Sequence, residues 1–345
     1  MKAVVKRKAE KGAEFVENFP IPKPGPKEVL VKIKATAICG TDIHIYDWSE
    51  WAQGAGIKFP LVLGHECSGE IIEVGNEVKE SKIGDYVACE THIFCGTCFQ
   101  CKNGTSHICQ NLKAFGAYID GCFAEYTVLP EKCIYKIPDT ISPEIGALLE
   151  PLGPALRACM ELQLTGDIVA IIGCGPIGLL SLASAKAMGA SKIIAIDVIE
   201  DRLKLAKDMG AYLVLNPKNN SDIVGEIMNI TDGIGVDSFI EASGNIDAIN
   251  QGFKYLRKGG KIAFVGLPSK KLEINLISDI VFKEAKIIGI HGREIFRTWT
   301  KMVNMLTNGN LNISPIITNI MPLEKYQEAF QLLDEGCGCK IVLIP

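Results

Sequence analysis

The first 150 residues or so carry apolar side chains in short runs that are separated by turn residues. The runs with a β-like alternation are EVLVKIKATAI, CSGEIIEVG, DYVAC and CFAEYTVL. Between them lie PKPGP, VGNEV and KIGD, in which proline and glycine favour turns. This pattern predicts an irregular domain that is mostly β.

From about residue 165 the pattern changes, because apolar runs now alternate with stretches of helical periodicity. The apolar runs are DIVAIIG, KIIAID, VDSFIEAS, KIAFVG and AKIIGI, and the helical stretches are 176–188, 200–209 and 246–257. Such alternation predicts a parallel sheet that is covered by helices on both faces. In the remaining chain the pattern predicts helices over 295–308 and 323–335 and a last strand, KIVLI.

The composition agrees with a globular protein of two ordinary domains. The chain has 345 residues, of which 48% are hydrophobic and 22% charged. Its formal net charge is −4 and it has no basic run, so neither nucleic acid nor an anionic membrane is expected as a partner. The start, MKAVVKRKAEKG, lacks the apolar core of a secretory signal, and no apolar run approaches the roughly 18 residues that span a bilayer. We therefore expect a cytoplasmic location.

A cluster of cysteines is the most specific chemical signal in the sequence. Cys95, Cys98, Cys101 and Cys109 form the pattern C-x2-C-x2-C-x7-C. Thiols stay reduced in a cytosol, which favours a metal over a disulfide cage, although redox use remains an alternative. Four thiolates can surround one Zn²⁺ tetrahedrally and leave no open position, so this site would stabilise a lobe, about residues 89–112, without taking part in chemistry.

A glycine motif follows the first strand of the second region. Gly173, Gly175 and Gly178 form G-x-G-x-x-G between a predicted strand and a predicted helix, the context in which this motif binds a dinucleotide pyrophosphate. The next predicted strand ends in Asp197, where a carboxylate can bind a ribose 2′-hydroxyl and repel a 2′-phosphate. This predicts NAD in preference to NADP, while Arg202 leaves room for a phosphate. A purely structural glycine turn is the alternative.

Two earlier segments hold candidate ligands for a second metal. Cys39 lies in AICGTDIHIYDW, and His65 and Glu66 are adjacent in LVLGHECSGEI. A catalytic zinc takes three ligands from Cys, His and Asp or Glu, and keeps a fourth position open. These three residues would serve, but they form no local motif, so the fold must bring them together.

The order of these motifs resembles that of a known superfamily. CGTDIHIY, LGHECSGEI, the four cysteines, LLEPLG and GCGPIG are similar to the motifs of zinc-dependent medium-chain alcohol dehydrogenases over essentially the whole chain. The resemblance implies a GroES-like catalytic domain over 1–152 and 291–345 and a Rossmann NAD-binding domain over 153–290. It further implies two zinc ions per subunit, a small-molecule substrate and a homotetramer.

The same resemblance assigns roles to individual residues. It implies that Cys39, His65 and Glu66 hold the catalytic zinc and that the four clustered cysteines hold the structural one. It places Glu150 beside the catalytic zinc, His92 in the wall of the substrate pocket, and Thr41 and His44 in a proton relay. Further cofactor contacts are implied for Ile177, Asp197, Arg202, Val265, Gly266, Leu267, Ile290 and His291.

A narrower resemblance points to one branch of the superfamily. The runs HIYDWSEWA, HGREIFRTWTKM and LNISPIIT are similar to those of the L-threonine 3-dehydrogenase family. This implies oxidation of a threonine side-chain alcohol by NAD⁺. Polyol dehydrogenases of the 2,3-butanediol or sorbitol type share the zinc and cofactor motifs, so they are the alternative. A dehydrogenase scaffold without activity is a third hypothesis, and the complete set of ligands argues against it.

Overall fold

The computed structural model describes residues 1–268 and 270–345, and the chain divides into two compact units. Unit 1 comprises Met1–Glu150, Glu294–Val303 and Ile317–Pro345, and unit 2 comprises Pro151–Arg293 and Asn304–Ile316. The division differs from the domain ranges expected from sequence mainly at Asn304–Ile316, which belongs to unit 2. No helix in the described part of the chain is long and apolar enough to cross a membrane.

Unit 1 is mostly β. A three-stranded sheet has the order β2 (Glu14–Val16), β1 (Ala3–Lys6), β4 (Leu61–Val62). The largest sheet has the order β10 (Ile134–Lys136), β6 (Tyr86–Cys89), β5 (Glu66–Val74), β3 (Glu28–Ala37), β18 (Lys340–Ile344), β17 (Ile317–Pro322), and β9 (Tyr126–Pro130) also pairs with β3. A small third sheet joins β7 (His92–Ile93) to β8 (Lys113–Ala114).

Short helices fill the connections of unit 1. These are α1 (Gly40–Asp47), α2 (Glu50–Gly54), α3 (Phe99–Lys102), α4 (Pro143–Ala147) and α11 (Tyr326–Asp334). The alternating apolar residues of β3 explain its position, because Val29, Val31 and Ile33 enter the same buried cluster as Ile71 of β5. The sheet is therefore held by side chains on one face of each strand.

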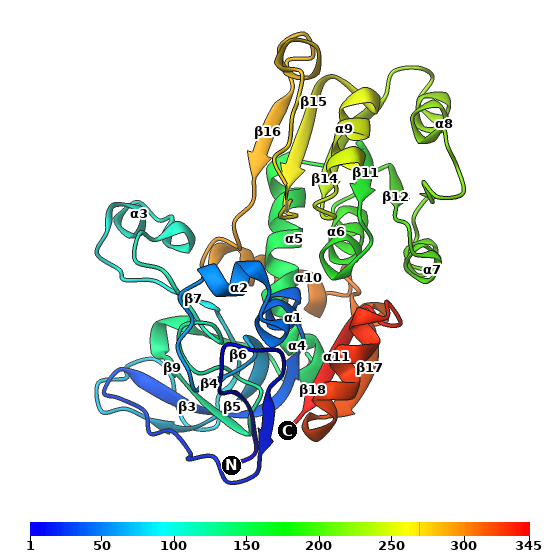
Figure 1. The fold of residues 1–345 in the computed structure, drawn as a ribbon. Helices are drawn as coiled ribbons and strands as arrows, with labels where there is room; N and C mark the ends of the chain where they lie inside the picture. Colours follow the sequence, from blue (N-terminus) through cyan, green and yellow to red (C-terminus); the bar gives the residue numbers. More distant parts are fainter. Residues whose placement is uncertain (269) are drawn as a thin grey trace. The chain divides into compact units, whose positions relative to one another are not determined.

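Unit 2 is a parallel sheet with helices around it (Figure 1). The strand order is β13 (Leu213–Leu215), β12 (Lys192–Ile196), β11 (Ile168–Ile172), β14 (Val236–Glu241), β15 (Leu256–Phe264), β16 (Lys286–Gly289). The connecting helices are α6 (Pro176–Ala187), α7 (Glu200–Asp208), α8 (Ile223–Ile230) and α9 (Ile246–Tyr255). The helices α5 (Leu149–Leu162) and α10 (Arg297–Thr307) contain two of the four points at which the chain passes from one unit to the other.

The strand order of unit 2 reverses between β11 and β14. In chain order the six strands run 3-2-1-4-5-6, which is the doubly wound arrangement that binds dinucleotides at the carboxyl ends of the strands beside this reversal. The predicted fold class, a mostly β part and a doubly wound parallel sheet, is thereby confirmed. Helices α5 and α8 were not predicted, and neither were the short helices α1, α2, α3 and α4 of unit 1.

Candidate active site

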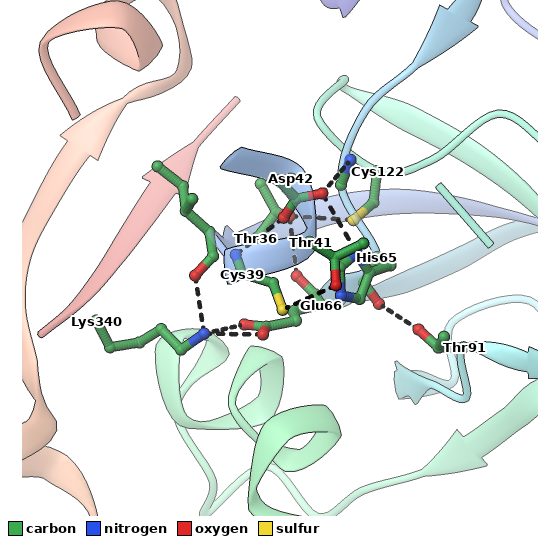
Figure 2. A network of polar contacts seen from close by, with 11 residues as sticks. Thr36, Cys39, Thr41, Asp42, His65, Glu66, Thr91, Cys122 and Lys340 are labelled. Atoms are coloured by element: carbon green, nitrogen blue, oxygen red, sulfur yellow. Dashed lines mark hydrogen bonds and ion pairs between the residues drawn. The ribbon is translucent and has the colours of Figure 1, made fainter. Parts of the chain in front are cut away.

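The side chains of Cys39, His65 and Glu66 converge in unit 1, as Figure 2 shows. Their ligand atoms all lie within 4.8 Å of one another. The convergence follows from the pairing of β3 with β5, because Ala37 near the end of β3 lies opposite Glu66 at the start of β5. Cys39 then caps the N-terminus of α1 two residues after Ala37. The fold supplies the proximity that sequence spacing could not.

Close packing of backbone fixes the turn that carries His65. Gly64 has a φ of +89°, and a Cβ built on it would lie 2.1 Å from the ring of Phe123. The positions of Gly116 and Gly121 are equally tight, because a Cβ on either would lie within 2.2 Å of the Gly64 carbonyl oxygen. Only glycine fits these three positions. The turn before β5 is therefore held from two sides.

Asp42 of α1 contacts the segments that carry Cys39 and His65. Its fully buried carboxylate accepts hydrogen bonds from the backbone N–H of Cys39 at 2.9 Å and of Gly64 at 3.2 Å. It also lies 3.3 Å from Nδ1 of His65. Burial acts to lower the pKa of His65, but Asp42 and Cys39 outweigh it and raise that pKa well above the usual value. An Nδ1–H held by a carboxylate leaves Nε2 as the metal-binding nitrogen.

Glu66 is paired with a buried lysine from the far end of the chain. Lys340 Nζ donates to both carboxylate oxygens of Glu66, at 2.8 and 2.7 Å, and to the carbonyl of Ile38 at 2.8 Å (Figure 2). Burial raises the pKa of Glu66 to about 7, against the opposing effect of Lys340. Lys340 therefore opposes protonation of the buried carboxylate and fixes its orientation.

Replacement of Lys340 by methionine is expected to weaken metal binding at this site about 10-fold at neutral pH. Without the ammonium group, the pKa of Glu66 rises further and a bound metal has to displace a proton. Competition with a chelator measures the affinity. Lys136→Met removes an exposed lysine that pairs with Asp85, and should leave the affinity unchanged. Equal affinities in the Lys340 variant and the unaltered protein would contradict the role of this pair.

The other residues expected at the active site lie in unit 1, and their side chains differ in burial. Thr41 Oγ1 is 3.8 Å from the sulfur of Cys39. Glu150 is buried, and its charge adds to burial in raising the pKa of Glu66, so the two carboxylates are close enough to interact. His92 is buried and its Nδ1 lies 2.8 Å from Glu90. His44 is exposed on α1, with its ring 6.1 Å from that of Trp51.

The four clustered cysteines also converge. Their sulfurs lie within 4.8 Å of one another, with Cys98 at 3.5 Å from Cys101 and 3.7 Å from Cys109. Sulfurs bound at about 2.3 Å to a tetrahedral zinc stand about 3.8 Å apart, so the spacing fits one zinc ion. Hydrogen bonds from Thr97 and from the N–H of Cys98 lower the pKa of Cys95 to about 5, which favours the thiolate. All thirteen cysteines lie within the described residues, and none of them is in a disulfide.

A cavity of about 460 Å³ lies at the carboxyl ends of the strands in unit 2. Gly173, Gly175, Asp197 and Arg202 line it, as the sequence led us to expect. A Cβ on Gly175 would meet only Nη1 of Arg202, at 3.8 Å, so it would project into open space where a pyrophosphate could approach. A Cβ on Gly178 would lie 1.8 Å from the Gly173 carbonyl oxygen, which explains the third glycine by helix–strand packing.

Asp197 is tied to the glycine turn. Its Oδ2 accepts a hydrogen bond from the N–H of Cys174 at 2.6 Å, and its Oδ1 accepts one from the N–H of Ile199 at 2.9 Å. Nε of Arg202 is buried and has no hydrogen-bond partner within the described residues. The cavity therefore combines a fixed carboxylate with a guanidinium group that has donors available.

Other expected cofactor residues lie outside the lining of this cavity. Gly178 and Ile177 lie in α6, and Leu267 is 89% exposed after β15. Val265 and Gly266 donate hydrogen bonds to the carbonyl of Glu241, and the carbonyl of His291, next to Ile290, accepts one from Arg157. Sequence reasoning missed Pro217, which follows β13, and the lining residues of α9 and the turn before it, namely Ser243, Asn245, Asp247, Ala248 and Gln251.

Comparison with known proteins places these sites in a family. A family model described as "Alcohol dehydrogenase GroES-like domain" matches residues 25–139, and one described as "Zinc-binding dehydrogenase" matches residues 176–308. The chain is 47% identical to L-threonine 3-dehydrogenase of Pyrococcus furiosus, covering 100% of this chain and 98% of that protein. It is 43% identical to the Bacillus subtilis protein of the same name, with 100% and 99% covered. The chain belongs to the L-threonine 3-dehydrogenase family.

Solved structures of other zinc dehydrogenases share the fold of this L-threonine 3-dehydrogenase family member. The 2R,3R-butanediol dehydrogenase of Bacillus subtilis is 31% identical with a TM-score of 0.89, covering 100% of this chain and 99% of that one. A zinc-binding dehydrogenase of Sinorhizobium meliloti 1021, bound to NADP, is 31% identical with a TM-score of 0.90, with 100% and 99% covered.

The residues present fit the groups that an L-threonine 3-dehydrogenase family member would bind. Cys39, His65 and Glu66 are a donor set that zinc accepts while keeping a fourth position for a substrate. Sequence reasoning missed the partners that hold this set, Asp42 and Lys340. A signal existed for both: Asp42 is an acidic residue within CGTD, and Lys340 is a lone charge at the start of the apolar run KIVLI.

Proposed function

We propose that this chain oxidises the secondary alcohol of L-threonine with NAD⁺ and produces 2-amino-3-oxobutanoate and NADH. The main support for this proposal is the sequence identity of 43–47% to L-threonine 3-dehydrogenases over the whole chain. The identity to a butanediol dehydrogenase of the same fold is lower, at 31%. The three ligands in unit 1 and the cavity in unit 2 supply the two kinds of site that such a reaction requires.

We further propose that each chain holds two zinc ions and one NAD. Unit 1 is the catalytic domain, in which Cys39, His65 and Glu66 hold the reactive zinc and the four-cysteine lobe holds the other. Unit 2 is the cofactor domain, where Asp197 favours NAD over NADP. When bound, the reactive zinc supplies Lewis acidity that lowers the pKa of an alcohol, and NAD⁺ supplies the hydride acceptor.

The residues of the chain handle the proton. We assign to Thr41 the hydroxyl that accepts the substrate proton, because its Oγ1 lies beside the sulfur of Cys39. His44 is the exit, since it is exposed on the same helix and an imidazole can exchange protons with solvent. Glu150 lies close enough to Glu66 to assist, and His92 lines the substrate pocket. Val265, Gly266, Leu267, Ile290 and His291 remain proposed contacts of the cofactor.

Oxidation of a polyol or of 2,3-butanediol is the second candidate function, because a butanediol dehydrogenase shares the fold at 31% identity. The deciding experiment measures NADH formation by the zinc-loaded protein with L-threonine, 2,3-butanediol and sorbitol under one condition. We expect L-threonine to have the largest kcat/KM by about 10-fold or more. A diol with the higher kcat/KM would refute the threonine assignment while leaving the zinc and cofactor assignments intact.

We also propose a cytoplasmic homotetramer. Apolar side chains are exposed around the edge strand β16 of unit 2, on η3 (Leu276–Val281) and beside it. The most exposed are Phe282 at 70%, Leu276 at 61% and Ile277 at 60%. Exposed apolar clusters of this kind are typical of subunit contacts. Native mass spectrometry tests the proposal, and a monomeric mass at micromolar concentration would contradict it.

A further inference from the structure

Glu90 is a fully buried carboxylate that contacts His92 directly. Its Oε1 lies 2.8 Å from both the backbone N and the ring Nδ1 of His92. Its Oε2 accepts a hydrogen bond of 2.8 Å from the indole N–H of Trp299, 209 residues away. The chain bends at Thr91 between β6 and β7, which lets the Glu90 carboxylate reach both the backbone N–H and the ring of His92.

The donors around Glu90 favour its ionised form. A backbone N–H and an indole N–H can only donate, and one of them points at each carboxylate oxygen. An ionised carboxylate accepts from both donors, and in that state Nδ1 of His92 donates the third hydrogen bond to Glu90. We infer that Glu90 is the positioning residue of His92: it holds the proton on Nδ1 and directs Nε2 to the opposite side of the ring.

Trp299 fixes the second oxygen of Glu90 from a remote part of unit 1. Its side chain is completely buried, and Tyr135 stacks on it at 5.4 Å with an interplanar angle of 27°. Phe296 meets it edge-on at 6.3 Å. A ring confined on two faces cannot swing its N–H away from Glu90. The carboxylate is therefore held by two segments that are distant in sequence.

The pair of Glu90 and His92 is also linked to the proposed metal ligands. Thr91, between them, donates its hydroxyl to the backbone carbonyl of His65 at 3.0 Å, as Figure 2 shows. His92 itself pairs with Ala114 in the two-stranded sheet. These backbone contacts set where the imidazole stands relative to His65, and Glu90 sets how the ring is turned and where its proton sits.

The inference rests on the proposed function, because the orientation of His92 affects turnover only if His92 contacts the substrate. Replacement of Glu90 by glutamine conserves the shape, and an amide that keeps its oxygen on the N–H of Trp299 places its NH₂ group beside Nδ1. A neutral imidazole that receives a hydrogen bond at Nδ1 carries its proton on Nε2. The group presented to the substrate then changes from an acceptor to a donor, which is an electronic change and not a change of packing.

Side-chain ¹⁵N NMR of the zinc-loaded protein tests the tautomer directly. The chain has five histidines, and the His92→Asn variant assigns the signal of His92 by its disappearance. We expect His92 of the unaltered protein to carry its proton on Nδ1, and the Glu90→Gln variant to carry it on Nε2. For L-threonine, kcat/KM of this variant should fall about 10- to 100-fold at unchanged zinc content and unchanged KM for NAD⁺.

Two further variants separate positioning from folding. Trp299→Phe keeps an aromatic ring against Tyr135 and removes the indole N–H together with part of the ring, so we expect a loss of about 3- to 10-fold with the proton still on Nδ1. Glu131→Gln is the matched control, because Glu131 accepts backbone N–H groups from Lys79, Glu80 and Ser81 and not from His92, and it should stay within about twofold.

The experiments on Glu90 test its role separately from the proposed function. A proton on Nε2 of His92 in the unaltered protein overturns the inference, and so does an unchanged kcat/KM in the Glu90→Gln variant. If the unaltered protein fails to oxidise L-threonine, the proposed function fails. The tautomer measurement then still decides whether Glu90 positions His92, because it needs no substrate.

Discussion

Replacement of Cys39 by serine is expected to lower kcat/KM for L-threonine by about 10³-fold or more. Cys39 is one of three side chains whose ligand atoms converge within 4.8 Å, and a serine hydroxyl is not ionised at neutral pH. A site with two strong ligands should lose its zinc, and with it the Lewis acidity that lowers the pKa of the substrate alcohol. Elemental analysis should show the loss of one of the two proposed zinc ions per chain.

Cys337→Ser is the matched control, since Cys337 is an exposed thiol outside both groups of candidate ligands. It should retain activity and the full zinc content. The structural lobe should also be unaffected by Cys39→Ser, so the thermal unfolding temperature should change less than on replacement of Cys98. A Cys39→Ser protein that keeps all its zinc and most of its activity would show that the converging residues are not the catalytic metal site.

The fold class follows from sequence because the periodicities of the two units differ. In unit 2 the apolar runs that became β11, β12 and β14 alternate with helices whose ends were predicted within about two residues. Helix α5 was missed because LLEPLGPALRACM contains two prolines and a glycine, which usually interrupt helices. Close packing overrides this propensity: a Cβ on Gly153 would lie 2.3 Å from the side chain of Arg293.

Some candidate sites lie within short segments of the sequence, whereas another is formed by residues that are distant in sequence. The four cysteines and the glycine motif lie within short segments, so their spacing alone indicated their chemistry. The convergence of Cys39 with His65 and Glu66 could be inferred only by resemblance, because it depends on the register of β3 and β5. The partners that orient them were missed, since Lys340 is 274 residues from Glu66 and no local pattern connects the two.

Asp197 in the cofactor cavity is the second position at which we expect a substitution to change the kinetics strongly. Replacement of Asp197 by serine should raise KM for NAD⁺ about 10- to 100-fold and improve the use of NADP⁺. The carboxylate would accept hydrogen bonds from the ribose in NAD and repel the additional phosphate in NADP. Removing it leaves Arg202, whose buried Nε has no partner among the described residues, to bind that phosphate. Steady-state kinetics with both cofactors gives the ratio of their kcat/KM values.

Asp197 has a second role that the test must separate from the first. Because it accepts hydrogen bonds from Cys174 and Ile199, its loss also loosens the turn that carries Gly173 and Gly175. Asp197→Asn keeps an oxygen acceptor but removes the charge, so it should change the preference between the cofactors with a smaller loss of affinity for NAD⁺. Adding Arg202→Ala to Asp197→Ser should abolish the gain with NADP⁺.

Two patterns of kinetics would then distinguish the roles of Asp197. A reversal or strong shift of the cofactor ratio, dependent on Arg202, means that the carboxylate and the guanidinium discriminate at the ribose. An equal loss for NAD⁺ and NADP⁺, with a lower unfolding temperature and no dependence on Arg202, means that Asp197 serves the turn alone. In that case the preference for NAD would have to come from other lining residues of the cavity, of which Asp247 is the remaining carboxylate.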